Sequence, residues 1–123
     1  MLQAVPSGPG ELWLKLGGKL YRSTNAGTSF ALASGNDIAI DLFGLGRAAP
    51  GHNVASLYTI GTKGGIRAVW RSDDGGKSWA RINDDSNQWG LRFRAITGDP
   101  RLNGRVYVAT DGRGIFYGDP APR

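Results

Sequence analysis

The sequence predicts an all-β fold built from repeated units, and three observations support this prediction. Twenty glycines and six prolines are spread along the 123 residues among short apolar runs, as expected of frequent tight turns. The octapeptide STNAGTSF at 23–30 nearly recurs as SDDGGKSW at 72–79. A strand, a Gly-rich turn and a second strand are indicated at 10–23, 56–72 and 103–119.

The repeat has the spacing of propeller blades. The two octapeptides begin at Ser23 and Ser72, 49 residues apart, and blades of β-propellers recur at such intervals. We therefore predict a partial β-propeller of about three blades of antiparallel strands, at 2–34, 37–85 and 92–119, with the last blade incomplete. The strands expected in these units are 2–5, 11–16, 19–23 and 29–33, then 38–44, 56–62, 66–72 and 78–82, then 93–97, 105–110 and 114–117.

Each octapeptide is interpreted as the turn between the third and fourth strands of a blade. The Asp or Asn at its third position can accept hydrogen bonds from backbone N–H groups, and its glycine adopts positive φ at little cost. The closing aromatic is expected to cover the hairpin. The residues given this structural role are Ser23, Asn25, Gly27, Phe30, Ser72, Asp74, Gly76 and Trp79.

Composition argues against several classes of function. The formal net charge is +5, but Lys and Arg are scattered singly, so nucleic-acid binding is not expected. The chain has no cysteine and one histidine, His52, which is expected in a solvated loop; no metal site and no cofactor are predicted. The N-terminal stretch lacks the pattern of a signal peptide, and no apolar run approaches the roughly 20 residues of a membrane span.

Longer segments resemble a known enzyme family. SxDxGxSW is similar to the Asp-box, or BNR repeat, of β-propellers, which indicates a fold and not a reaction. The flanking sequence resembles the C-terminal part of the enzymes of glycoside hydrolase family 74. These are the xyloglucanases and the oligoxyloglucan reducing-end-specific cellobiohydrolases. The segments that carry this resemblance are LGGKLYRSTNAGTSF, FGLGRAAPG, SLYTIGT, VWRSDDGGKSWARINDD, QWG and AITGDPRLNGRVYVATDGRGIFYGD.

The resemblance implies a secreted parent enzyme with two seven-bladed propellers facing each other across a cleft for a branched β-glucan. Two Asp residues of that parent would carry out an inverting hydrolysis. The sequence contexts of the family's catalytic Asp residues do not occur here, and the pairs Gly98-Asp99 and Gly118-Asp119 match terminal, non-catalytic segments. No catalytic residue is therefore assigned, and the chain alone is expected to be inactive.

The same resemblance places the connections at 17–19, 63–67, 84–89 and 111–113 on the side of the substrate cleft. The residues proposed to contact xyloglucan or related β-glucan oligosaccharides are Asn87, Gln88, Trp89, Asp111 and Arg113, since amides and an indole suit sugar recognition. The alternative for Trp89 is closure of a seam between blades, and the alternative for Arg113 is anchoring of its own loop. Trp13 and Trp70 are expected in the core.

Three hypotheses about function remain open. The first is a propeller segment of a xyloglucan hydrolase, completed by the remainder of a larger propeller. The second is a stand-alone carbohydrate-binding module that self-associates, because a stack of fewer than four blades leaves apolar faces and strand edges uncovered. The third is a propeller that binds other proteins.

Overall fold

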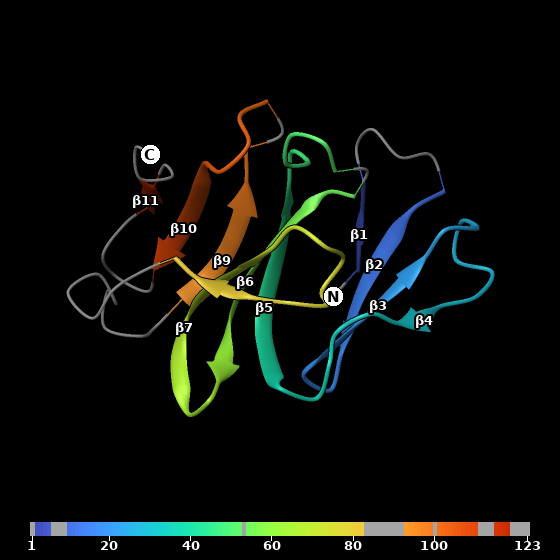
Figure 1. Ribbon diagram of the computed structural model, residues 1–123, viewed down its shortest axis with the longest axis horizontal. Coiled ribbons are helices and arrows are strands. Elements are labelled where there is room, and N and C mark those ends of the chain that lie inside the picture. Colours follow the sequence, from blue (N-terminus) through green and yellow to red (C-terminus); the bar gives the residue numbers. More distant parts are fainter. Residues whose placement is uncertain are drawn as a thin grey trace.

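The fold is all-β, as predicted. The computed structural model describes residues 2–5, 10–52, 54–82, 93–99, 101–110 and 115–118, and every regular element in these ranges is a strand. The strands form three antiparallel sheets that stand side by side without closing into a ring (Figure 1). The described residues contain no helix that is long and apolar enough to cross a membrane.

Within each sheet, strands that follow one another in the chain are also neighbours in space, as in a β-meander. The first sheet has the order β1-β2-β3-β4, with strands Leu2–Ala4, Leu12–Leu16, Lys19–Ser23 and Ala31–Leu32. The second sheet has the order β5-β6-β7-β8, with strands Ile38–Gly46, Ser56–Lys63, Ile66–Ser72 and Ala80–Arg81. The third sheet has the order β9-β10-β11, with strands Phe93–Gly98, Val106–Thr110 and Ile115–Gly118.

The fourth strands are shorter than the sequence predicts, and β5 is longer. β4 and β8 have two residues each, because the octapeptide turn before each of them occupies residues that were expected to be strand. β5 continues to Gly46, because it pairs with β6 over its whole length, with one register shift between Ile40 and Leu42.

An aromatic and aliphatic seam joins the first and second sheets. Trp13 and Leu20 from the first sheet are fully buried against the second sheet, where Phe43 and Leu57 are fully buried too. Burying each of these large side chains contributes roughly 2 kcal/mol. Two hydrogen bonds cross the seam: Ile40 N donates to Gly18 O at 2.9 Å, and Gln3 Nε2 donates to Phe43 O at 2.9 Å.

The second and third sheets are joined by a second apolar seam. Ile60 and Val69 pack against Ile96 and Val108 across this second seam. β6 is buried from Ser56 to Gly61, because successive side chains face the first and the third sheets in turn.

Glycines let the inner strands β5 and β9 approach each other. A Cβ at Gly44 would lie 2.1 Å from Ile96 O and 2.6 Å from Thr97 Cα. A Cβ at Gly98 would lie 2.5 Å from Gly46 Cα. Because backbone atoms are the obstacles, no side chain is accommodated without moving one sheet away from the other.

The outer face of the first sheet is rich in leucine and lies in solvent. Trp13 and Leu20 point into the seam, so their strand neighbours point away from it. Leu2, Leu16 and Leu32 are 58%, 63% and 52% exposed. The residues on this surface, called the leucine face below, are Leu2, Leu12, Leu14, Leu16, Tyr21 and Leu32.

The two octapeptides form matching turns. Gly27 N and Gly76 N each donate to the Oγ of the first serine at 2.9 Å. Asn25 Oδ1 accepts from Ser29 N at 3.0 Å, and Asp74 Oδ1 accepts from Ser78 N at 2.9 Å. The side-chain oxygen at the third position therefore holds both hairpins.

The closing aromatics of the two turns differ in burial. Trp79 is 8% exposed and packs in the first seam, whereas Phe30 is 37% exposed. The difference follows from position, because the second turn packs against Ala33 and Ser34, which directly follow β4 of the first sheet. Among the described residues no sheet stands beyond the first one to cover Phe30.

Substitution of Gly44 by alanine is expected to separate the second and third sheets. Because the new Cβ would overlap the Ile96 carbonyl, the free energy of unfolding should fall by about 3 kcal/mol or more. Gly118→Ala is the control, since nothing lies within 4 Å of a Cβ there, and should change it by less than about 0.5 kcal/mol. Urea denaturation measures both; equal effects would contradict the close approach of β5 and β9.

The two turns should differ in their response to acid. Partial burial acts to raise the pKa of Asp74, but hydrogen bonds from Ser78, Ser72 and Lys77 outweigh it and lower that pKa to about 2. Because the folded pKa lies below the unfolded value of 3.8, stability is present above pH 4 and is lost as the pH falls toward 2. Since Asp74 is half exposed, the loss should be only about 1 kcal/mol.

The variant Asp74→Asn gives the second turn the neutral acceptor that the first turn has at Asn25. Unfolding measured between pH 5 and pH 2 should show a smaller loss of stability for this variant than for the wild type. Identical pH dependence in the two proteins would show that the Asp74 carboxylate does not stabilise the turn.

Candidate functional site

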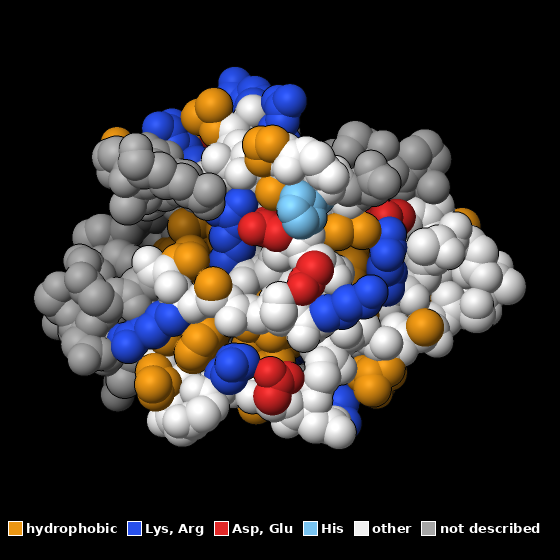
Figure 2. All heavy atoms as spheres, in the orientation of Figure 1, with side chains coloured by type: hydrophobic (Ala, Val, Ile, Leu, Met, Phe, Trp, Pro, Cys, Tyr) orange, Lys and Arg blue, Asp and Glu red, His pale blue; other side chains and the backbone are white. Residues whose placement is uncertain are grey.

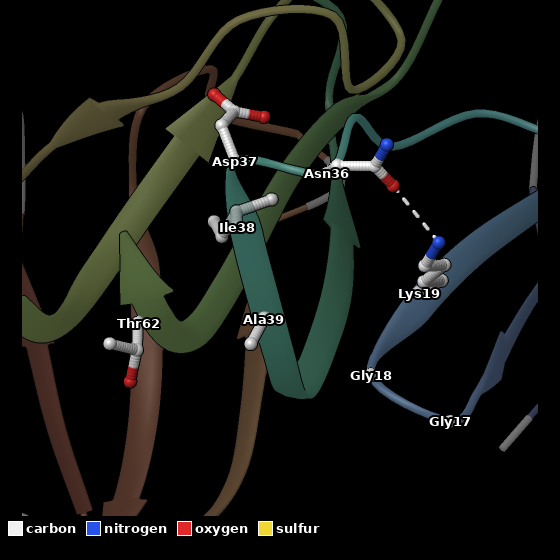
Figure 3. Close-up of a pocket in the computed structure, with 8 residues that line it drawn as sticks. All are labelled: Gly17, Gly18, Lys19, Asn36, Asp37, Ile38, Ala39 and Thr62. Atoms are coloured by element: carbon white, nitrogen blue, oxygen red, sulfur yellow. Dashed lines mark hydrogen bonds between the residues drawn. The ribbon is translucent and has the colours of Figure 1, made fainter. Parts of the chain in front are cut away.

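The candidate site lies at the end of the molecule where the β2–β3 and β6–β7 turns and the connection into β5 come together, the lower edge of Figure 1. The described parts of the connections after β5 and β9, at 47–52 and 101–105, lie at the opposite end. Side chains around the turns at the lower edge form a pocket of about 290 Å³ between the first and second sheets (Figure 3). The residues that line it are Gly17, Gly18, Lys19, Asn36, Asp37, Ile38, Ala39 and Thr62.

Glycine turns shape one wall of this pocket. Gly17 and Gly18 have φ of 60° and 81°, and Gly64 and Gly65 in the β6–β7 turn have φ of 60° and 77°. Two successive positive φ values are typical of the two-residue turn that matches the twist of a hairpin. A Cβ at Gly17 would meet nothing within 4 Å, so the wall it forms is open to solvent.

The floor is fixed by the first seam. Ile38 is 4% exposed, and the hydrogen bond from Ile40 N to Gly18 O ties β5 to the β2–β3 turn. The pocket is therefore held by the same packing that joins the two sheets.

The polar groups of the pocket occupy two sides. Lys19 Nζ donates to Asn36 Oδ1 at 3.0 Å, and Figure 3 shows these two side chains pointing toward each other. The carboxylate of Asp37 points away from this pair in Figure 3, and one of its oxygens lies 4.0 Å from Lys63 Nζ. Donors on one side and a carboxylate at the rim suit a ligand that carries hydroxyl groups.

Charges of both signs alternate around the pocket. Arg67 forms an ion pair with Asp41, and Lys63 Nζ lies 5.7 Å from the ring centroid of Trp70. The space-filling view shows acidic and basic side chains interspersed with apolar ones (Figure 2).

At the opposite end, the carboxylate of Asp99 accepts hydrogen bonds that stabilise a turn. Asp99 Oδ1 accepts from Arg101 N at 2.8 Å, and Oδ2 accepts from Tyr107 Oη at 2.9 Å. The hydrogen bond from Arg101 N–H lowers the pKa of Asp99. Burial acts to raise that pKa, but the hydrogen bond from Tyr107 lowers it further. A general acid needs a raised pKa, so neither Asp99 nor Asp74 has the electrostatics of one.

The described ranges contain no group of three or more His, Cys, Asp or Glu side chains that could hold a metal ion. His52 is exposed, and Trp13 and Trp70 are buried, at 0% and 7% exposure.

The sugar-binding residues proposed from the sequence fall outside the described ranges. They are Asn87, Gln88, Trp89, Asp111 and Arg113. Their assignment stays a prediction. Of the four connections proposed for the cleft side, 17–19 and 63–67 are described, and both lie at the end that carries the pocket.

Sequence reasoning did not single out Asn36, Asp37 or Thr62. The available signal was the string SGNDIAI at 34–40, in which two polar residues stand directly before an apolar strand. A connection between blades must begin at the same end as the glycine turns, so these residues could have been placed beside Lys19.

Comparison with known proteins identifies the family. No protein-family model matches the chain. A xyloglucanase of a Paenibacillus species is 51% identical over 125 aligned residues, covering 97% of this chain and 12% of that enzyme. A xyloglucanase of Acetivibrio thermocellus is 48% identical, covering 98% of this chain and 14% of that enzyme.

A solved structure shows the same backbone. The chain superimposes on the GH74 xyloglucanase from Xanthomonas campestris with a TM-score of 0.87 and 42% identity, covering 98% of this chain and 16% of that one. The chain thus spans less than a fifth of the length of each of these three enzymes. By sequence and by fold, this chain belongs to glycoside hydrolase family 74, of whose enzymes it corresponds to a small part.

Proposed function

We propose that the chain is a propeller segment of a xyloglucan-degrading glycoside hydrolase and contributes one wall of a cleft for a β-glucan. The observation that carries this proposal is the 48–51% identity with two xyloglucanases over nearly the whole chain. In this proposal the units 2–34, 37–85 and 92–119 are consecutive blades, the last of them completed elsewhere. The parent enzyme would act outside the cell, where its polymeric substrate is found.

The two ends of the molecule carry different residues, and this difference supports the proposal. The glycine turns and the pocket share one end, whereas Asp99 and the turn that it holds lie at the other. Loops at one end of a rigid scaffold commonly carry binding residues. The end with the pocket is therefore assigned to the cleft.

The catalytic pair is assigned to parts of the parent enzyme outside this chain. Inverting hydrolysis needs one carboxyl with a raised pKa and a second one roughly 6.5–9.5 Å away. The described carboxyls with a shifted pKa, Asp74 and Asp99, are both shifted downward and both bound within turns. These observations support a role in binding and not in bond cleavage.

An exchange of segments tests the proposal. The matching segment of the Paenibacillus xyloglucanase is replaced by this chain, and hydrolysis of xyloglucan is measured by release of reducing ends. Activity within about tenfold of the parent is expected, because the segment supplies a wall and leaves the reacting carboxyls in place. The purified 123-residue chain should show no hydrolysis; turnover by the chain alone would refute the assignment of the catalytic pair.

The leucine face favours self-association as a second candidate property. Three leucines of one sheet that are more than half exposed form the kind of surface that usually marks an interaction site. At the other end of the stack, Tyr117 is 65% exposed and its ring lies 6.2 Å from that of Tyr107, with Arg105 over it. Two copies could cover these end faces by packing one against the other.

Light scattering tests this second candidate. The wild-type chain should show a mass that rises with concentration, and Leu16→Lys combined with Leu32→Lys should shift the mass toward that of a monomer, because two charges on the leucine face oppose its burial. Lys77→Ala, on the exposed octapeptide turn, is a surface control. A monomeric mass at every concentration, with a cooperative melt, would exclude self-association.

A further inference from the structure

We infer that the pocket between the first and second sheets is a subsite for one neutral pyranose unit, whose hydroxyl groups bind to the described polar side chains of the pocket. This inference rests on the proposed function, because it names the part of the cleft wall that touches the glucan.

The pocket is an open depression near the lower limit of ligand-pocket volumes, so it can hold only a small unit such as one sugar ring. Its volume of about 290 Å³ lies just below the roughly 300–1,000 Å³ of pockets that enclose drug-sized ligands. One wall is the Gly17–Gly18 turn, which carries no side chain, and the apolar part of the lining is Ile38 and Ala39. A ring with an apolar face can therefore lie on the aliphatic part with its hydroxyls turned to the polar part.

The hydrogen-bonding groups lie on the side of Lys19. An ammonium group has three N–H donors, and one of those of Lys19 is directed to Asn36 Oδ1. This bond orients the exposed amide of Asn36 with its oxygen toward Lys19, so its Nδ2 donors point away from Lys19. Adjacent hydroxyls of a sugar accept from such donors and donate in turn to the amide oxygen. Lys19 is half-buried and held in place, which lowers the entropy lost on binding.

The rim of the pocket disfavours an anion. Asp37 lines the pocket, and one oxygen of its carboxylate lies 4.0 Å from Lys63 Nζ. A uronic acid would bring a second carboxylate beside this one, and like charges at short range repel. The cations Lys19 and Lys63 are each already directed to an acceptor.

Binding without stacking is weak. None of the described residues that line the pocket is aromatic, and the nearby Trp70 is 7% exposed, with Lys63 over its ring. A few neutral hydrogen bonds supply little net free energy, so we expect a dissociation constant on the order of millimolar.

Titration of the isotope-labelled chain by nuclear magnetic resonance tests the inference. The probes are a xyloglucan heptasaccharide, cellotetraose and tetragalacturonate. The neutral probes should shift the amide signals of residues 17–19, 36–39 and 62, and tetragalacturonate should not. Lys19→Met and Asn36→Ala should each weaken neutral binding about three- to tenfold, the value of one hydrogen bond.

Two further variants separate the pocket from the rest of the surface. Lys77→Met, the same change on the exposed octapeptide turn, should leave binding unchanged. Asp37→Asn should keep affinity for the neutral probes within about threefold and should allow tetragalacturonate to bind. Unchanged dispersion of the amide signals shows that each variant is folded.

Several results would overturn the subsite. They are shifts confined to other residues, equal weakening by Lys19→Met and Lys77→Met, tighter binding of tetragalacturonate than of the neutral probes to the wild-type chain, or no binding of any probe at 20-fold the expected constant, about 20 mM. If the chimeric enzyme still hydrolyses xyloglucan in these cases, the proposed function stands and only the subsite is wrong. If the chimera is folded but inactive, the proposed function is wrong.

Discussion

Packing between neighbouring sheets is the constraint on which the rest of the structure depends. A three- or four-stranded sheet of this size cannot bury its apolar side chains alone, so each sheet is stable only against a neighbour. β6, which is buried on both faces, is the centre of this arrangement. The absence of side chains at Gly44, Gly46 and Gly98 allows β5 and β9 to come close enough for the second seam to form.

The same packing produces the surface that we assign to the cleft. The bond from Ile40 N to Gly18 O joins the sheets at the point where the pocket lies, so the positions of Lys19 and Asn36 follow from the first seam. The leucine face shows the other consequence, because that face of the first sheet has no neighbour among the described residues. Burial and binding are thus two results of one stacking pattern.

Most of the fold could be predicted from the sequence, because its signals are local. The 49-residue repeat and the short apolar runs between Gly-rich turns predict the three sheets, and eight of the eleven strands lie within a residue of the predicted bounds at each end. The length of β5 could not be predicted, since it depends on pairing with β6. The pocket was missed because the sequence analysis did not place the polar residues at 36–37 beside the glycine turn, although Asn36 bonds to Lys19, 17 residues away in the chain.

Fragment complementation tests the central claim most directly, namely that these sheets are consecutive blades that complete a larger ring. The Paenibacillus xyloglucanase is produced without the segment that matches this chain, and the purified 123-residue chain is added to it. Saturable recovery of xyloglucan hydrolysis, abolished by Leu16→Lys combined with Leu32→Lys, is the predicted result. A folded, soluble truncated enzyme that the chain neither binds nor reactivates would contradict the account.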